Sequence, residues 1–399
     1  MKMWTLGIDI AKRKHVATLL DSDGKKVFKN FVFTNTMDGV NLLFEKLKET
    51  DHSKESLLIG MEATGHYWMT LYHYLVNTGF RVRLVNPLMT AARRNVGIRG
   101  TKTDSVDAQL IANILRETDL KFSAVPDDEV RQLRNWTRLR YECSQTFIAE
   151  KQRLIGLLDI VFPEYTNHFS DVFGVASRQL LEKYPTADDI KKIDIRKLTR
   201  ILKDASKGRM GREHAQRLKD AAESSFSLSS SNLSFALEIR FLVQRMNILL
   251  EQIEELEKQI KRYMKESQKL LQSIPGIGPV WAPTILAEIL PVFHPEEKNG
   301  ARKLVAAAGL DIRLNESGEK KGKGKMSKRG SRYLRTAAIQ AAEIAALVAR
   351  DPMFRSIYEK QKAKGKKHMV AISHVANKML HVVFSVLKNQ KPYEVRFNH

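Results

Sequence analysis

The first hundred residues alternate between short apolar runs and amphipathic segments, a pattern typical of a mixed α/β domain. Runs rich in β-branched and aromatic residues predict strands, and apolar positions spaced three or four apart predict helices. Strands are expected at residues 4–11, 15–20, 27–33, 57–62 and 80–85, and helices near 38–49 and 67–77. Three consecutive strands followed by alternating helices and strands predict a mixed sheet.

The remainder of the chain reads as mainly helical. Long helices are expected at 128–162 and 233–273, and shorter ones at 280–290, 333–350 and 369–387. The near-heptad spacing of the two long helices favours a coiled coil, although packing within one chain explains it equally well. We therefore divide the chain into an α/β domain (1–125), a helical coiled-coil or linker region (126–270) and a mainly α C-terminal domain (271–399).

Charge narrows the class of partner. The 399 residues carry a formal net charge of +22, which favours nucleic acid first and an anionic membrane second. We find no apolar run of the roughly 18 residues that a membrane span needs, and no signal peptide. The single cysteine, Cys143, excludes an intramolecular disulfide and a cysteine zinc cluster. The expectation is a soluble intracellular protein that binds DNA, RNA or both.

Four acidic residues occupy unusual positions. Asp104 and Asp107 share a face at the start of a helix expected over 104–115, and their mutual repulsion would be relieved by a divalent cation. A helix cap and a first-turn dipole partner are the alternative. Asp9 and Glu62 end apolar strands, where an unpaired acid is costly. Each alone could pair with an arginine or face solvent, but four together predict a metal site.

Two basic elements in the last third predict contacts with phosphate. Residues 271–279 resemble a helix-hairpin-helix element, in which Gly276 and Gly278 would let backbone N–H groups approach a phosphate; a plain tight turn is the alternative. Residues 320–332 form a glycine-interrupted cationic strip, or else a solvated loop. The strip holds no acid, and its basic residues are Lys320, Lys321, Lys323, Lys325, Lys328, Arg329 and Arg332.

Four short motifs lie in a fixed order along the chain. They are Gly7-Ile8-Asp9-Ile10-Ala11-Lys12, Met61-Glu62-Ala63-Thr64-Gly65, Asn86-Pro87 and Lys102-Thr103-Asp104-Ser105-Val106-Asp107-Ala108. Together they resemble the DEDD transposase family of bacterial insertion sequences, the bridge-RNA-guided recombinases. The resemblance is weakest across residues 160–230.

The resemblance implies a RuvC-like, ribonuclease-H-type N-terminal domain. Its four acids fall on Asp9, Glu62, Asp104 and Asp107, which would be catalytic and would bind two Mg²⁺ ions. A serine nucleophile of the C-terminal transposase domain falls on Ser317. The residues alone do not choose Ser317 over Ser327 or Ser331; the register of the resemblance does.

The resemblance also implies RNA-guided DNA strand exchange in the bacterial cytoplasm, at the nucleoid when acting. The partners would be donor and target DNA, a bridge RNA and further copies of the chain, as a dimer or tetramer. One alternative is a RuvC-like, structure-specific nuclease whose serine loop only clamps DNA. Another is a non-catalytic nucleic-acid-binding protein, which would have no reason to keep four acids in a basic chain.

Overall fold

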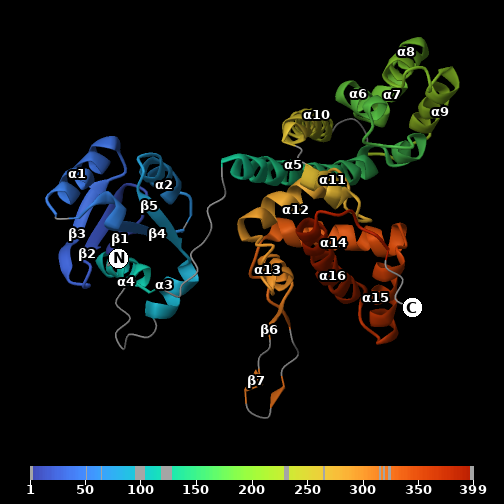
Figure 1. The fold of residues 1–399 in the computed structure, drawn as a ribbon. Helices are drawn as coiled ribbons and strands as arrows, with labels where there is room; N and C mark the ends of the chain where they lie inside the picture. Colours follow the sequence, from blue (N-terminus) through green and yellow to red (C-terminus); the bar gives the residue numbers. More distant parts are fainter. Residues whose placement is uncertain are drawn as a thin grey trace. The chain divides into compact units, whose positions relative to one another are not determined.

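The computed structural model describes residues 3–50, 52–63, 65–94, 104–117, 128–228, 233–263, 266–313, 316–317, 320–321 and 325–395 (Figure 1). The chain forms two compact units, Met1–Val125 and Pro126–His399. Each unit is described by itself.

The first unit is built on a five-stranded mixed sheet with the strand order β3-β2-β1-β4-β5. The strands are β1 (Trp4–Asp9), β2 (Lys14–Leu20), β3 (Lys26–Thr34), β4 (Leu57–Glu62) and β5 (Arg81–Val85). The first three pair antiparallel, whereas β1, β4 and β5 are parallel. Ile8 lies beside Met61 in the register, so Asp9 and Glu62 end adjacent strands at the same edge. The predicted strands and the mixed sheet are confirmed.

The alternation of side chains along β1 and β4 gives the sheet two covered faces. One face packs Leu6, Ile8, Ile59 and Met61 into a core with helices α1 (Met37–Lys48) and α2 (Trp68–Asn77). The opposite face carries α4 (Asp104–Leu115), whose apolar side chains pack with β4 and β5. Helix α3 (Pro87–Arg94) follows β5 and contacts α4.

Two neighbouring glycines make the seat on which α4 lies. Gly7 and Gly60 are register partners on β1 and β4. A Cβ on Gly7 would stand 2.0 Å from the backbone oxygen of Ala108, and one on Gly60 would stand 2.6 Å from a methyl of Leu115. At Gly7 the helix backbone therefore rests directly on the strand backbone, which only glycine permits, whereas at Gly60 the close contact is with the side chain of Leu115. At the far end of α4, Arg116 donates to the backbone oxygen of Asp21 at 2.7 Å.

The second unit begins with an antiparallel pair of long helices, α5 (Asp128–Val161) and α10 (Leu233–Arg262). Their direction follows from three ion pairs along their length, Arg140–Glu257, Glu150–Arg245 and Arg153–Glu238. The near-heptad spacing of both helices is thus used for packing within the chain. A coiled coil with another chain stays a prediction.

A small helical module is inserted between α5 and α10. After a 3₁₀ turn at Pro163–His168, it contains α6 (Val175–Lys183), α7 (Ala187–Lys192), α8 (Ile195–Ala205) and α9 (Arg212–Glu223). Their apolar faces share one core with the C-terminal part of α5 and with α10.

The C-terminal part is an all-helical core around α16 (His368–Asn389). Its other helices are α11 (Glu266–Gln272), α12 (Trp281–Ile289), α13 (Gly300–Ala307), α14 (Arg332–Glu343) and α15 (Pro352–Ala363). By length and composition alone α16 could cross a membrane, but 56% of that stretch is buried among the other helices. It is therefore a core helix. From the sequence we had expected no apolar stretch long enough to cross a membrane.

Two expected helices differ from the structure. The helix expected over 233–273 is divided into α10 and α11. The helix expected over 333–350 changes at its end to a π-helical turn, Ile344–Val348, in which Ala349 donates to the carbonyl of Ile344 at 2.8 Å. Such a turn inserts one residue into the helix, which hydrophobic spacing does not reveal.

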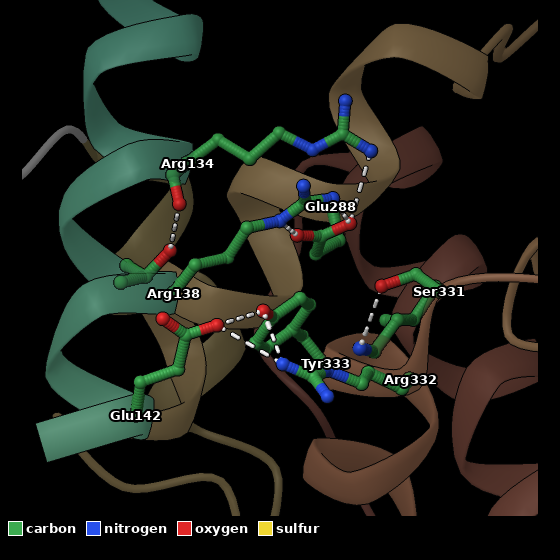
Figure 2. Close-up of polar contacts among 9 residues, drawn as sticks. Arg134, Arg138, Glu142, Glu288, Ser331, Arg332 and Tyr333 are labelled. Carbon is green, nitrogen blue, oxygen red and sulfur yellow. Dashed lines mark hydrogen bonds and ion pairs between the residues drawn. The ribbon is translucent and has the colours of Figure 1, made fainter. Parts of the chain in front are cut away.

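A buried carboxylate joins α5 to α12 (Figure 2). The side chain of Glu288 is fully buried and accepts hydrogen bonds from Arg134 at 3.0 Å and from Arg138 at 2.6 and 3.0 Å. Burial opposes its charge, but these bonds prevail and lower the pKa of Glu288. One turn on, Glu142 accepts from Tyr333 and Arg332 of α14. The beginning of α5 thus fixes both α12 and α14.

The glycine seat predicts that Gly7→Ala destabilises the first unit by about 2–4 kcal/mol, because the new methyl group overlaps backbone atoms that cannot move aside. Gly156→Ala is the matched control. Gly156 lies inside α5 with open space around it, so alanine should stabilise by about 0.5–1 kcal/mol. Urea unfolding followed by circular dichroism measures both. An unchanged midpoint for Gly7→Ala would contradict the seat.

The buried carboxylate predicts that Glu288→Gln lowers the stability of the second unit by about 3 kcal/mol, because two arginines lose their counter-charge. Glu213→Gln is the control, since the Glu213–Arg217 pair is exposed on α9 and such pairs contribute little. Differential scanning calorimetry should show a lower melting temperature for the first variant only. Equal melting temperatures would show that the junction is not important for stability.

Candidate active site

Four acidic residues meet at one edge of the first unit's sheet. Asp9 is the last residue of β1 and Glu62 the last of β4, while Asp104 and Asp107 lie in the first turn of α4. Asp9 and Glu62 are half-buried, Asp104 is exposed, and Asp107 is only 7% exposed. The glycine seat is two residues before each strand acid, so it brings the start of α4 to the same edge.

The electrostatics show that these acids act on one another. Burial, and then the negative charges of Asp107, Asp104 and Glu62 in that order of importance, together raise the pKa of Asp9 to about 6. A backbone hydrogen bond from Ile10 opposes the rise only weakly. Burial and the three other acids therefore oppose the ionisation of Asp9.

The cluster has the donor chemistry of a site for a hard divalent cation. It offers only carboxylate oxygens, the ligands preferred by Mg²⁺ and similar ions. Among the described residues, no three His, Cys, Asp or Glu side chains converge closely enough to hold a metal ion as they stand. Carboxylates that repel one another are expected to stand apart until a cation screens them.

Thr90 is a site residue that the sequence did not indicate. It is buried in α3, and its hydroxyl lies 2.7 Å from a carboxylate oxygen of Glu62 and 2.9 Å from the carbonyl oxygen of Pro87. A hydroxyl has one proton, and the charged acceptor is the stronger of the two. Thr90 thus orients Glu62. A threonine within a helical segment gives no sequence signal for this role, and the preceding Asn86-Pro87 marks only the start of the helix.

The second candidate element is a hairpin in the C-terminal part. Ser317 belongs to the two-residue strand β7 (Glu316–Ser317), which pairs antiparallel with β8 (Lys320–Lys321), so that Ser317 lies opposite Lys320. At its base, β6 (Ile312–Arg313) pairs with β9 (Lys325–Met326). The sequence predicted a loop here, and these short strands were not expected.

The other two candidate serines have structural roles at the base of this hairpin. The hydroxyl of Ser327 donates to the carboxylate of Asp311, and its backbone N–H donates to the carbonyl of the same residue at 2.9 Å. Ser331 caps α14 by accepting from the N–H of Leu334 at 3.2 Å. Both hydroxyls are therefore engaged in holding the backbone.

The basic strip is described only in part. Lys325, Lys328 and Arg329 are exposed, whereas Arg332 is bonded to Glu142 and Tyr333. Lys320 and Lys321 form β8, and Lys323 lies outside the described residues. Arg332 is thus committed to the junction with α5, and the role of the others in binding nucleic acid stays a prediction.

The two glycines of the helix-hairpin-helix-like segment differ from each other. Gly276 has a φ of +87°, and a Cβ there would stand 2.1 Å from the backbone oxygen of Ala341 in α14. Internal packing alone therefore accounts for this glycine. Gly278 has open space around it and precedes α12. A phosphate contact by this segment stays a prediction.

Comparisons with known proteins agree with this arrangement. A DEDD-type transposase model of the IS110 kind matches residues 6–163, which include all four acids, and a model described as the transposase IS116/IS110/IS902 family matches residues 268–359, which include Ser317. The chain is thus a transposase, a DNA-rearranging enzyme. It belongs to the IS110 family of insertion-sequence transposases.

Full-length relatives support this assignment. A 44.8 kDa protein of insertion element IS116 from Streptomyces clavuligerus is 24% identical over 98% of this chain and 96% of its own length. The pilin gene-inverting protein of Moraxella bovis is also 24% identical, over 98% of both chains. The transposase for insertion sequence element IS1328 from Yersinia enterocolitica is 36% identical over 26% of this chain and 30% of its own.

The raised pKa of Asp9 predicts how metal-free stability depends on pH. Between about pH 4 and 6 the folded state binds more protons than the unfolded state, so stability falls as pH rises through this window. Asp9→Asn removes the free-energy cost of ionising Asp9 in the folded state. It should therefore stabilise the metal-free protein by about 1–2 kcal/mol at pH 7.5, after allowance for solvent screening, but not at pH 4.

Thermal unfolding in a chelating buffer at both pH values measures this difference. Glu45→Gln, on the exposed side of α1, is the control and should change little at either pH. Destabilisation by Asp9→Asn at pH 7.5 would mean that Asp9 is stabilised by a partner and not repelled by the other acids.

Proposed function

We propose that this transposase catalyses RNA-guided DNA strand exchange for an insertion sequence, with Asp9, Glu62, Asp104 and Asp107 as a divalent-metal site and Ser317 as the nucleophile. The observation that carries the proposal is the placement of the four acids at one edge of the sheet, where burial and the three other acids raise the pKa of Asp9 to about 6. A protein that only bound DNA would gain nothing from such a cluster, since acids repel the phosphate backbone.

The four acids would hold Mg²⁺, which as a Lewis acid stabilises negative charge that develops on phosphoryl oxygens. Within the chain, Thr90 keeps Glu62 oriented and the glycine seat keeps the start of α4 beside the ends of β1 and β4. The metal-free cluster is raised in energy by its own repulsion, and this favours the uptake of a cation.

The serine step conserves the phosphodiester bond. The hydroxyl oxygen of Ser317 attacks the phosphorus of the DNA backbone and loses its proton, while the bond from phosphorus to one sugar oxygen breaks and that oxygen takes up a proton. The product is a phosphoserine link between protein and DNA. A sugar hydroxyl of another strand reverses the step, so strands are exchanged without an external energy source.

Two observations support Ser317 over its neighbours. Ser327 and Ser331 use their hydroxyls at the base of the hairpin and at the N-terminus of α14. Ser317 lies on the outer strand pair, opposite Lys320, and lysines can stabilise the charge of a phosphorane-like transition state. The metal site and the serine site would cooperate across subunits of a dimer or tetramer.

Guidance by a bridge RNA rests on the family and on the charge of the chain. In such systems base pairing reads the sequence, and the protein binds backbone and shape. A net charge of +22 suits the simultaneous binding of RNA and DNA. The name of the Moraxella bovis relative says that it inverts a gene, and inversion requires both cutting and rejoining. This favours a recombinase over the rival RuvC-like nuclease.

The test is a denaturation-resistant adduct. Labelled DNA incubated with the protein, guide RNA and Mg²⁺ should give a protein–DNA band on a denaturing gel. Ser317→Ala should lose the band and at least about a thousandfold of exchange activity, yet still bind DNA. Ser327→Ala and Ser331→Ala should keep the band.

Asp104→Asn provides the second arm of the same experiment. It retains the serine but removes one carboxylate of the cluster, so it should bind DNA and form no adduct. Exchange by Ser317→Ala, or an adduct on another residue, would refute the serine assignment. Full adduct formation by Asp104→Asn would refute the role of the acids.

A further inference from the structure

Helix α8, in the module between α5 and α10, presents a row of basic side chains along one side. Arg196, Arg200 and Lys203 follow one another at spacings of four and three residues, which places them on one face of the helix, and Lys207 stands just beyond its end at Ala205. All four are exposed, whereas Leu198 and Leu202 of the opposite face are fully buried in the module core. We call these four residues the α8 stripe.

The like charges of the stripe destabilise α8 when the helix is considered alone. Like charges three or four residues apart repel each other, and among the described residues no acid makes an ion pair with any of the four. Asp204 borders the stripe without pairing, and Asp194 is occupied with capping α8. Lys197, on the flank, lies over the ring of Tyr184 at 5.7 Å. The charge of the stripe is therefore left for an external anion.

Lys207 differs from the other three residues in its backbone conformation. Its φ is +55°, in the left-handed region that follows the end of α8, and Gly208 beside it has a φ of +84°. Glycine is the favoured residue at such a helix end, and a lysine there is strained. The side chain is thus retained at a cost to the backbone, just beyond the end of α8.

The dimensions of the stripe fit a phosphate backbone. Arg196 and Lys203 lie about 10 Å apart along the helix axis, about the length of three base pairs of a duplex. Arg209 and Arg212, both exposed, continue the positive surface through the turn to α9. A rigid helix with fixed charge spacing is better suited to bind a duplex than to bind a flexible single strand.

We propose that the α8 stripe is a binding site for the sugar-phosphate backbone of a nucleic-acid duplex. Duplex DNA and a paired region of a guide RNA share this chemistry, and the test separates them. The matched family regions end at residue 163 and resume at residue 268, so they assign nothing to this module. The inference rests on the proposed function only in taking nucleic acid as the partner.

The test measures binding of the full-length Ser317→Ala protein to a 30-base-pair DNA duplex and to an RNA duplex of equal length, by fluorescence anisotropy at several salt concentrations. Replacing all four stripe residues by glutamine should lower the log-affinity versus log-salt slope by about 3 to 4, at roughly 0.9 per lost phosphate contact. A loss with one duplex alone identifies that duplex as the partner, and a loss with both identifies the shared backbone.

Two control variants have four substitutions each. Arg196→Lys, Arg200→Lys, Lys203→Arg and Lys207→Arg together keep the charge and should keep the slope. The second control places glutamine at Lys25, Lys26, Lys29 and Lys48, which are exposed in the first unit. It removes the same net charge as the stripe variant but should keep most of the salt slope. An equal fall for stripe and distant variants, or no fall for the stripe, would overturn the proposal.

Lys207→Gly is a sharper single variant. It should raise the melting temperature, because the left-handed backbone is relaxed, while it lowers the salt slope by about 1. A rise in melting temperature with unchanged slope would remove Lys207 from the site. Because binding is measured with a serine variant, failure of the adduct experiment does not affect this result.

Discussion

The contact between β1 and α4 is the constraint on which the candidate metal site depends. Strand β1 supplies Asp9, and α4 supplies Asp104 and Asp107. They come together because Gly7 and Gly60 leave no side chain between the strand backbones and the helix. A larger residue at Gly7 would meet the backbone of α4, lift the helix from the sheet and separate the acids. Glycine lowers the stability of a strand. Here this loss is explained by the acidic cluster, which the two glycines allow to form.

The four acids repel one another, and the packing of the rest of the first unit must offset this repulsion. The apolar face toward α1 and α2, and the packing of Ile111, Ile114 and Leu115 of α4 with β4 and β5, hold the edge together. In the second unit the equivalent problem is solved in the opposite way, since the buried Glu288 is fully compensated by Arg134 and Arg138. A compensated charge stabilises a junction, whereas a cluster of like charges would favour the uptake of a cation.

Much of this could be predicted from the sequence. Strand and helix positions in the first unit followed from hydrophobic spacing, and the four acids stood out because acids are costly at the ends of apolar strands. The glycine seat was not predicted, because a glycine in a strand can also indicate a bulge. Thr90, the π-helical turn and the short strands around Ser317 left no trace in the spacing, since tertiary contacts and local backbone geometry determine them. The α8 stripe was not predicted, because only the helix shows which basic residues share an exposed face.

The central claim is that burial and three neighbouring acids raise the pKa of Asp9, and that a bound divalent cation would lower it. The most direct measurement is a carbon-13 NMR titration of the full chain labelled at aspartate carboxyl groups, with Asp9→Asn to assign the signal. The account predicts that Asp9 titrates with a pKa of about 6 without metal, and at a clearly lower pH with saturating Mg²⁺. An Asp9 signal that titrates near pH 4 without metal, or that Mg²⁺ leaves unchanged, would contradict it.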